Sequence, residues 1–270
     1  MCRLAAFPPN FPRIEALQIL AEFEKTNTDG TGSVYVKDGE FVVEKWPEPF
    51  SKLVRREPFL GHMPYNGWTL AHLRAASNGA PLKRNTHPFV VGPWAVIHNG
   101  IWTDHNLVRL ALSRTVKMKG DTDSEVAAHL WEIIGPKRFA EAMDFNGVFL
   151  GLKKDGHLWV AKTSGDLEMK ALKKDRTLMA SELDAGKYDE RVDALYRWYH
   201  FDENGVHVTH KETRTSFKYG SYGASFNQGQ YFGCQSTVAA KTSFGGRSIG
   251  VTTPSTSPDW HPYYSGRGCE

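Results

Sequence analysis

The second residue, Cys2, has a position that could turn it into a complete catalytic centre. Cysteine is small enough for a methionine aminopeptidase to remove Met1, and Cys2 would then carry a thiol and a free α-amino group. A thiol beside a base is a nucleophile, and an α-amine titrates near pH ~8, so it can act as that base close to neutrality. An early cysteine also occurs by chance, so this prediction depends on the segments that follow.

Three later segments hold residue types that could bind and activate an amide. They are 71–79 (AHLRAASNG), 94–101 (WAVIHNGI) and 120–126 (GDTDSEV). In this order after Cys2 they resemble the class II glutamine amidotransferases, the N-terminal-nucleophile (Ntn) hydrolases that take ammonia from glutamine. That family combines an N-terminal Cys, a His-x-Arg segment, a His-Asn-Gly turn and a Thr-Asp-(Ser/Thr)-Glu segment. Segment 27–32 (NTDGTG) also resembles the Asp-Gly-x-Gly stretch of such domains, and the resemblance spans residues 2 to 182.

Two charged residues are candidates for holding the two ends of an amino acid. Arg74 could clamp a carboxylate, because its planar guanidinium matches a carboxylate bidentately. The alternative is an ordinary ion-paired arginine, although Arg74 lies in an apolar run where an unpaired charge is costly. Asp123 could face the substrate ammonium or cap the apolar helix that follows, and both roles are compatible. The resemblance selects Asp123 over Asp121 and implies that Ser77 also binds substrate.

The resemblance assigns Asn99 and Gly100 to an oxyanion hole, in which the Asn amide and the Gly backbone N–H stabilise the charge on the attacked oxygen. The alternative is a strand-ending Asn-Gly turn, which is a common hairpin signal. His98 alternates with Asn99 along a strand and would point to the other face, so we interpret it as structural. His72 stands in the same relation to Leu73 and Arg74, and we expect it to support the site by packing or hydrogen bonding.

The composition is that of an ordinary globular protein, with 40% hydrophobic and 23% charged residues. The net charge of +3 and the absence of a dense Lys/Arg stripe argue against nucleic-acid binding. Apolar runs fall short of the ~20 residues of a membrane helix, so no membrane association is expected. The 3 cysteines form neither a disulfide framework nor a zinc motif, which favours a reducing cytoplasm. The resemblance implies no cofactor and no metal.

The pattern of apolar residues predicts strands, then helices, then strands again, which favours an α+β fold with two sheets between helices. The resemblance implies a four-layer αββα sandwich. Predicted strands are 2–7, 33–36, 40–45, 69–76, 94–98, 147–153, 157–162, 177–181, 195–201 and 206–210. Predicted helices are 12–23, 104–113, 123–134 and 137–143. We assign residues 1–218 to the amidotransferase domain and 219–270, rich in Gly, Ser and aromatic residues, to a flexible tail.

Three hypotheses follow from these observations. The first is a glutaminase that forms a Cys2 thioester and releases ammonia to a separate synthetase, since the sequence shows neither a Gly-x-x-x-x-Gly-Lys phosphate loop nor a Ser-Gly-Gly-x-Asp-Ser loop. The second is an independent hydrolase of another γ-glutamyl amide, motivated by Ala75 and Asn78, which differ from the residues usual in the family. The third is a structural or interaction protein that keeps the fold without catalysis.

Deletion of residues 219–270 should leave most of the glutamine hydrolysis, because all the proposed catalytic residues precede residue 147. The same deletion should weaken association with an ammonia-accepting partner, since apolar anchors on a flexible chain are a common binding mode. The two measurements are glutamine hydrolysis and partner pull-down on the truncated protein. Loss of folding or of hydrolysis would show that the tail belongs to the sandwich.

Overall fold

The computed structural model describes most of the chain up to residue 207. The described residues are 1–55, 63–77, 79–143, 145–165, 167–172, 176–183, 190–191, 197–202 and 205–207. The segment 219–270 lies outside them, so the domain boundary before it and the role of the tail stay predictions.

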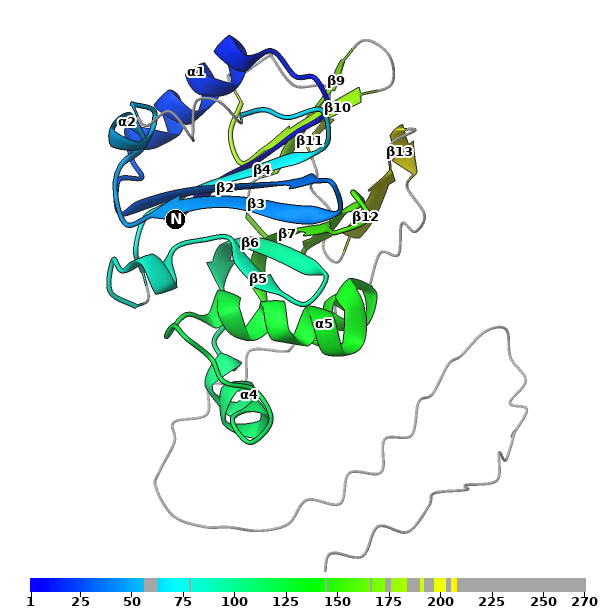
Figure 1. Cartoon of the computed structure of the whole chain (residues 1–270). Coiled ribbons are helices and arrows are strands. Elements are labelled where there is room, and N and C mark those ends of the chain that lie inside the picture. Colours follow the sequence, from blue (N-terminus) through cyan, green and yellow to red (C-terminus); the bar gives the residue numbers. More distant parts are fainter. Residues whose placement is uncertain are drawn as a thin grey trace, which may run out of the picture. The chain divides into compact units, whose positions relative to one another are not determined.

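Two antiparallel sheets form the centre of the fold (Figure 1). The first sheet has the strand order β11-β9-β10-β1-β4-β2-β3, and the second has the order β13-β12-β8-β7-β6-β5. In chain order, the strands of the first sheet are β1 (Arg3–Phe7), β2 (Gly30–Lys37), β3 (Glu40–Trp46), β4 (Thr69–Arg74), β9 (Glu168–Leu172), β10 (Arg176–Ala180) and β11 (Glu190–Arg191). Those of the second are β5 (Phe89–Val91), β6 (Trp94–Ile101), β7 (Asn146–Lys153), β8 (Leu158–Lys162), β12 (Arg197–Asp202) and β13 (Gly205–His207).

Helices cover the outer face of each sheet, which gives four layers (Figure 1). Helices α1 (Arg13–Glu24) and α2 (Phe50–Leu53) lie on the first sheet, α5 (Asp123–Ala142) lies on the second, and α4 (His105–Leu112) packs against α5. A short 3-10 helix, η1 (Lys83–Asn85), interrupts the loop between β4 and β5. The expected αββα sandwich of Ntn hydrolases is therefore confirmed.

Side chains along β1 alternate between two of the three apolar cores. Leu4 and Ala6 belong to the core between the sheets, whereas Ala5 and Phe7 belong to the core under α1 and α2. A third core, which contains Trp131 of α5, lies between the second sheet and its helices. Because neighbouring side chains of a strand point to opposite faces, the even-numbered residues of β1 face the second sheet.

Most predicted elements are present, with shifts of one or a few residues at their ends. The two helices expected at 123–134 and 137–143 are joined as α5, but its backbone is non-helical at Gly135, where φ is 78°. Five of the elements in the described residues were not predicted: α2, η1, β5, β9 and β11. Strand β9 has the sequence EMKAL, whose residues favour helices, and its pairing with β10 overrides that preference.

Ser181 joins β1 to the end of β10. The backbone N–H of Leu4 donates to Ser181 Oγ at 2.9 Å, and the Ser181 N–H donates to the Leu4 carbonyl at 2.9 Å. Ser181 is fully buried, so water has no access to replace its hydroxyl.

Ser181→Ala should lower the free energy of unfolding by about 1–3 kcal/mol, because the buried Leu4 N–H loses its acceptor. Urea unfolding of the full chain measures this change. The matched control is Ser113→Ala, which removes an exposed hydroxyl and should change stability by less than about 0.5 kcal/mol. Equal stability of Ser181→Ala and wild type would contradict the assigned role.

Candidate active site

The candidate nucleophile and the candidate carboxylate clamp lie on neighbouring strands. The β1–β4 register pairs Arg3 with Leu73 and Leu4 with His72, so its continuation places Cys2 opposite Arg74. Cys2 and Arg74 are even-numbered, and even-numbered side chains of β1 and β4 point toward the second sheet. The Cys2 thiol donates to the Ala75 carbonyl with an Sγ–O distance of 3.5 Å. Pairing of strands thus brings together two residues that are 72 positions apart in sequence.

The thiol of Cys2 is partly buried and lies among charged groups. Burial raises its pKa, the positive charge of Arg74 lowers it, and the negative charge of Asp123 raises it. A thiol with a raised pKa is mostly protonated at neutral pH, so its attack on an amide requires a base that takes the proton.

Arg74 is buried, with 2% of its surface exposed. Its guanidinium donates to the carbonyls of Ala80 at 3.0 Å and Gly79 at 2.7 Å, which holds the following loop over the end of β4. Burial lowers the pKa of Arg74, and the acidic groups Cys2, Asp29 and Asp123 oppose that shift. The guanidinium is therefore a buried cation whose neighbours are one thiol and two carboxylates.

Two residues before β2, Asp29 and Asn27, hold the end of β4 and the N-terminus in place. Asp29 Oδ2 accepts from the Ala76 N–H at 2.8 Å, and the Asp29 N–H donates to the Arg74 carbonyl at 3.0 Å. The fully buried Asn27 donates through Nδ2 to the carbonyls of Met1 at 2.8 Å and Leu73 at 3.2 Å. Asn27 thereby anchors the N-terminus beside β4. Sequence reasoning missed this role, because an asparagine before Thr-Asp-Gly is also an ordinary turn residue.

Asn99 lies on β6 and is 2% exposed. Its Nδ2 donates to Ser181 Oγ at 3.5 Å, while its Oδ1 is buried without a hydrogen-bond partner among the described residues. Ser181 therefore contacts both the strand that carries Cys2 and the candidate oxyanion residue, although the sequence patterns did not identify it. A buried amide with an unused acceptor is unusual in a purely structural role.

Gly100 pairs with Gly147 across β6 and β7 at a close approach of the two backbones. A Cβ at Gly100, where φ is 154°, would lie 2.0 Å from the Asn146 carbonyl oxygen, so the position excludes larger residues. The backbone conformation of Asn99 and Gly100 is thus fixed by the pairing of β6 with β7, and these residues do not form a turn.

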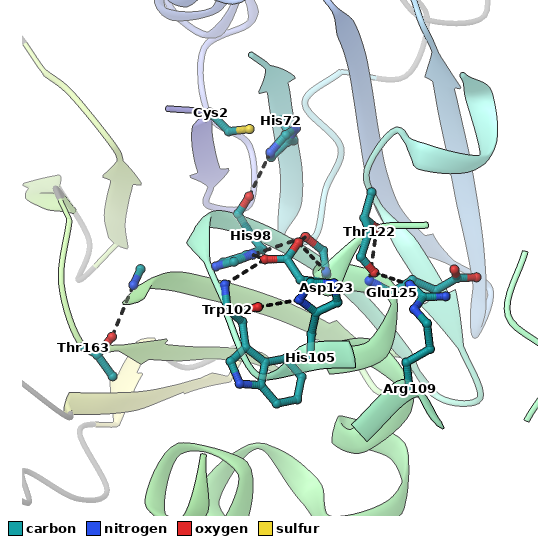
Figure 2. Close-up of polar contacts among 12 residues, drawn as sticks. Cys2, His72, His98, Trp102, His105, Arg109, Thr122, Asp123, Glu125 and Thr163 are labelled. Carbon is teal, nitrogen blue, oxygen red and sulfur yellow. Dashed lines mark hydrogen bonds and ion pairs between the residues drawn. The ribbon is translucent and has the colours of Figure 1, made fainter. Parts of the chain in front are cut away.

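Asp123 begins α5 and receives backbone hydrogen bonds on both carboxylate oxygens (Figure 2). Its Oδ2 accepts from the Trp102 N–H at 2.9 Å, and its Oδ1 accepts from the Ser124 N–H at 2.8 Å. The N-cap itself is Thr122, whose hydroxyl accepts from the Glu125 N–H. Asp123 therefore sits at a helix N-terminus without being the capping residue, and its charge acts on both Cys2 and Arg74.

His98 points away from Asn99, as the strand alternation predicted. Its ring stacks on Phe149 with centroids 3.8 Å apart, and its Nδ1 lies 3.2 Å from Ser124 Oγ and 3.8 Å from Asp123 Oδ2. Burial lowers the pKa of His98 to about 4, and the charge of Asp123 raises it. The contacts agree with a structural residue that packs β6 against α5.

His72 links the two sheets. Its Nε2 donates to the His98 carbonyl at 3.0 Å (Figure 2). Its ring lies 3.9 Å from the ring of His87, measured between centroids. Burial lowers the pKa of His72 to about 3, so the ring stays neutral and is a weak base. The expectation that His72 supports the site by hydrogen bonding is confirmed.

The loop before Asp123 is held by two side chains that sequence reasoning did not single out. Glu125 accepts from the N–H groups of Lys119 at 2.7 Å and Gly120 at 2.8 Å. Arg109 of α4 donates to the carbonyls of Gly120 at 2.9 Å and Thr122 at 2.7 Å (Figure 2). These bonds fix the approach of the chain to α5.

Ser77 is the candidate for which the structure gives least support. It is exposed in the loop after β4, and the neighbouring Asn78 lies outside the described residues. Its assignment to substrate binding stays a prediction. Within the described ranges, the structure contains no cluster of three or more His, Cys, Asp and Glu side chains arranged for a metal ion. In those same ranges no helix combines the length and apolar character that crossing a bilayer requires.

Comparisons with known proteins agree with this geometry. The sequence matches no profile of a known protein family. It is 31% identical over 177 residues to the glutamine–fructose-6-phosphate aminotransferase of Mycobacterium tuberculosis, covering 62% of this chain and 28% of the relative. The corresponding protein of Aquifex aeolicus is 34% identical over 118 residues, covering 42% of this chain and 19% of the relative. The chain thus spans less than a third of the length of these curated relatives.

Solved structures share the fold at low sequence identity. The allosteric regulatory enzyme of purine biosynthesis superposes with a TM-score of 0.64 at 16% identity, covering 76% of this chain and 48% of that one. A glutamine aminotransferase class-II domain protein from Silicibacter pomeroyi gives a TM-score of 0.52 at 16% identity, covering 76% of this chain and 97% of that one. The sequence relatives and the shared αββα sandwich show that this chain is similar to class II glutamine amidotransferases and has their fold.

Proposed function

We propose that this protein hydrolyses the side-chain amide of glutamine through a thioester on Cys2. The observation that carries the proposal is the placement of Cys2 opposite the buried Arg74 at the open end of β1 and β4. A thiol nucleophile next to a buried guanidinium is the arrangement that an amino-acid amide needs. The guanidinium holds the carboxylate while the amide reaches the thiol.

The base in this proposal is the α-amine of Cys2, freed by removal of Met1. Two histidines lie near the site, but each has its pKa lowered by burial, His72 to about 3 and His98 to about 4. Such groups hold a proton poorly near neutral pH, whereas an α-amine titrates near pH ~8. The amine also lies on the nucleophilic residue, so no second side chain has to be positioned.

The reaction has two balanced halves. The α-amine takes the thiol proton as Cys2 Sγ attacks the amide carbon, and the oxyanion is stabilised by Asn99 Nδ2 and the Gly100 N–H. Collapse of the intermediate breaks the C–N bond, and the α-ammonium protonates the leaving ammonia. A water molecule, deprotonated by the same amine, then attacks the γ-glutamyl thioester and releases glutamate and the thiol.

Asp123 and Ser77 are the remaining candidates for binding the charged groups of glutamine. Asp123 offers a buried carboxylate for the substrate ammonium, and its two backbone donors keep it oriented. Ser77 would complete the carboxylate site from the loop after β4. This loop is held by the bonds from Arg74 to Gly79 and Ala80, so substrate binding would compete with them or shift them.

We infer that the ammonia serves a separate synthetase and that the protein acts in the cytoplasm, where a reducing environment keeps Cys2 as a thiol. The support is that the relatives are named as aminotransferases. The second candidate is an independent hydrolase of a larger γ-glutamyl amide. It is favoured by Ala75, a small residue whose carbonyl contacts the nucleophile where the family often has Trp or Tyr.

Processing is predicted to be required for activity. A fusion that ends in a protease site directly before Cys2 should be inactive until cleavage exposes the α-amine, because an acylated nitrogen cannot act as a base. Intact mass and glutamine turnover are measured before and after cleavage. Cleaved Cys2→Ala protein is the control and should remain inactive with an unchanged melting temperature. Full activity of the uncleaved fusion would falsify the α-amine mechanism.

Substitutions that preserve shape should separate binding from chemistry. Arg74→Lys and Asp123→Asn should each raise KM for glutamine about tenfold to a hundredfold, since each weakens a charge-assisted contact worth about 1.5–3 kcal/mol. Asn99→Ala should lower kcat by about 10²–10³, because its contact strengthens only as the oxyanion forms.

The controls for these three substitutions are Arg114→Lys and Asn106→Ala, which change exposed side chains. They should leave both kinetic constants unchanged. A kinetically silent Asn99→Ala would exclude Asn99 from the oxyanion hole. An effect of Arg74→Lys on kcat alone would exclude Arg74 from ground-state carboxylate binding.

A further inference from the structure

A cationic cavity lies where the edges of the two sheets meet, between β3 and β5. Its volume is about 710 Å³, within the range of small-molecule sites. Both strands are the last of their sheets, so neither has a further strand beside it in the described part of the fold. The start of α5 and the loop before it complete the wall.

Positively charged side chains outnumber carboxylates in the cavity wall. Its carboxylates are Glu40 and Glu125, and its cations are Lys45, Lys83, Arg84, Lys117, Lys119 and Lys154. Lys154 pairs with Glu40 at 2.7 Å, and Arg84 pairs with Asp121 at 3.6 Å. The other four cations have no ion pair with a carboxylate among the described residues. A protein with a net charge of only +3 thus concentrates unpaired positive charge in one concave place.

Lys45 is held in this wall by its own bonds. Its Nζ donates to the carbonyls of Thr86 at 2.8 Å and Pro88 at 2.9 Å and lies 5.0 Å from the centre of the Phe89 ring. Burial lowers the pKa of Lys45 to about 8, Glu125 raises it, and the nearby charges of Lys119 and Lys83 lower it further. An anion in the cavity would relieve this repulsion.

Apolar residues form the other part of the lining. Phe41 and Val43 of β3 and Phe89 and Val91 of β5 line the cavity. Lys83 lies over the Trp46 ring, with Nζ 3.7 Å from its centre, a cation–π contact that positions its ammonium group. A ligand that matches both parts carries a compact anionic group and a flat or apolar body.

We propose that this cavity binds a small phosphate ester, with the phosphate among Lys83, Lys117 and Lys119 and its organic group on the apolar wall. Lysine ammonium groups bind phosphate as point charges, and the apolar wall distinguishes an ester from the free ion. The site is separate from the proposed glutamine site, since its lining contains none of the candidate catalytic or glutamine-binding residues.

The test is calorimetric titration of the full-length protein at low salt with phenyl phosphate, inorganic phosphate and phenol. Phenyl phosphate should bind saturably to one site. Inorganic phosphate lacks the ring that contacts the apolar wall, and phenol lacks the phosphate that contacts the lysines, so each should bind about tenfold more weakly. Raising the salt concentration should weaken the phosphate-dependent part. No saturable binding of phenyl phosphate, or equal binding of inorganic phosphate, would overturn the proposal.

The variant that tests the location is the double substitution Lys117→Gln and Lys119→Gln. It should weaken phenyl phosphate binding about tenfold or more, since two unpaired cations are lost. The control with the same loss of charge is Lys25→Gln with Lys52→Gln, at exposed positions directly after α1 and within α2. Equal weakening in both double variants would show a general charge effect and overturn the site. Melting temperatures of both variants confirm that they are folded.

Discussion

The proposed roles of the Cys2, Arg74 and Asn99 side chains depend on the alternation of side chains along β1, β4 and β6. The strands are antiparallel or face one another across the sandwich, and their residues of one parity point into the space between the sheets. Cys2, Arg74 and Asn99 share that parity on their own strands. A shift of one residue in the β1–β4 register would move Cys2 opposite a side chain that faces α1. The same register buries the apolar core, so folding itself selects the alignment that the chemistry requires.

A buried polar network holds the two sheets at a fixed separation near this site. His72 of the first sheet donates to the backbone of His98 in the second, and Ser181 contacts both Leu4 and Asn99. Such groups are costly to bury unless they are paired, and once paired they permit few alternative arrangements. Burial also keeps both histidines neutral, so they orient the site without adding positive charge beside Arg74.

The order of motifs in the sequence selected the candidate site residues, because each motif is a short local pattern. Each motif places polar side chains where a buried strand or a helix start alone would not require them. The motifs are residues 71–74 and 97–100 on strands and 122–125 at the start of a helix. The alternation rule also predicted the outward direction of His98 correctly. The supporting residues were not predicted. Ser181 and Asn27 are ordinary residues in sequence, and their roles arise because their neighbours come from strands far away in the chain.

The sequence by itself determined the resemblance to class II glutamine amidotransferases and the candidate nucleophile, because these depend on residue types at short spacings. The resemblance implied the four-layer fold, and apolar periodicity agreed with it. Only the tertiary structure decided which distant groups meet. The β1–β4 pairing places Cys2 beside Arg74, and the β6–β7 approach requires glycine at both 100 and 147. It also brought lysines from β3, η1 and the loop before α5 around one cavity, although no segment of the sequence is strongly basic. Contacts between strands far apart in sequence are set by register and packing, which no local pattern encodes.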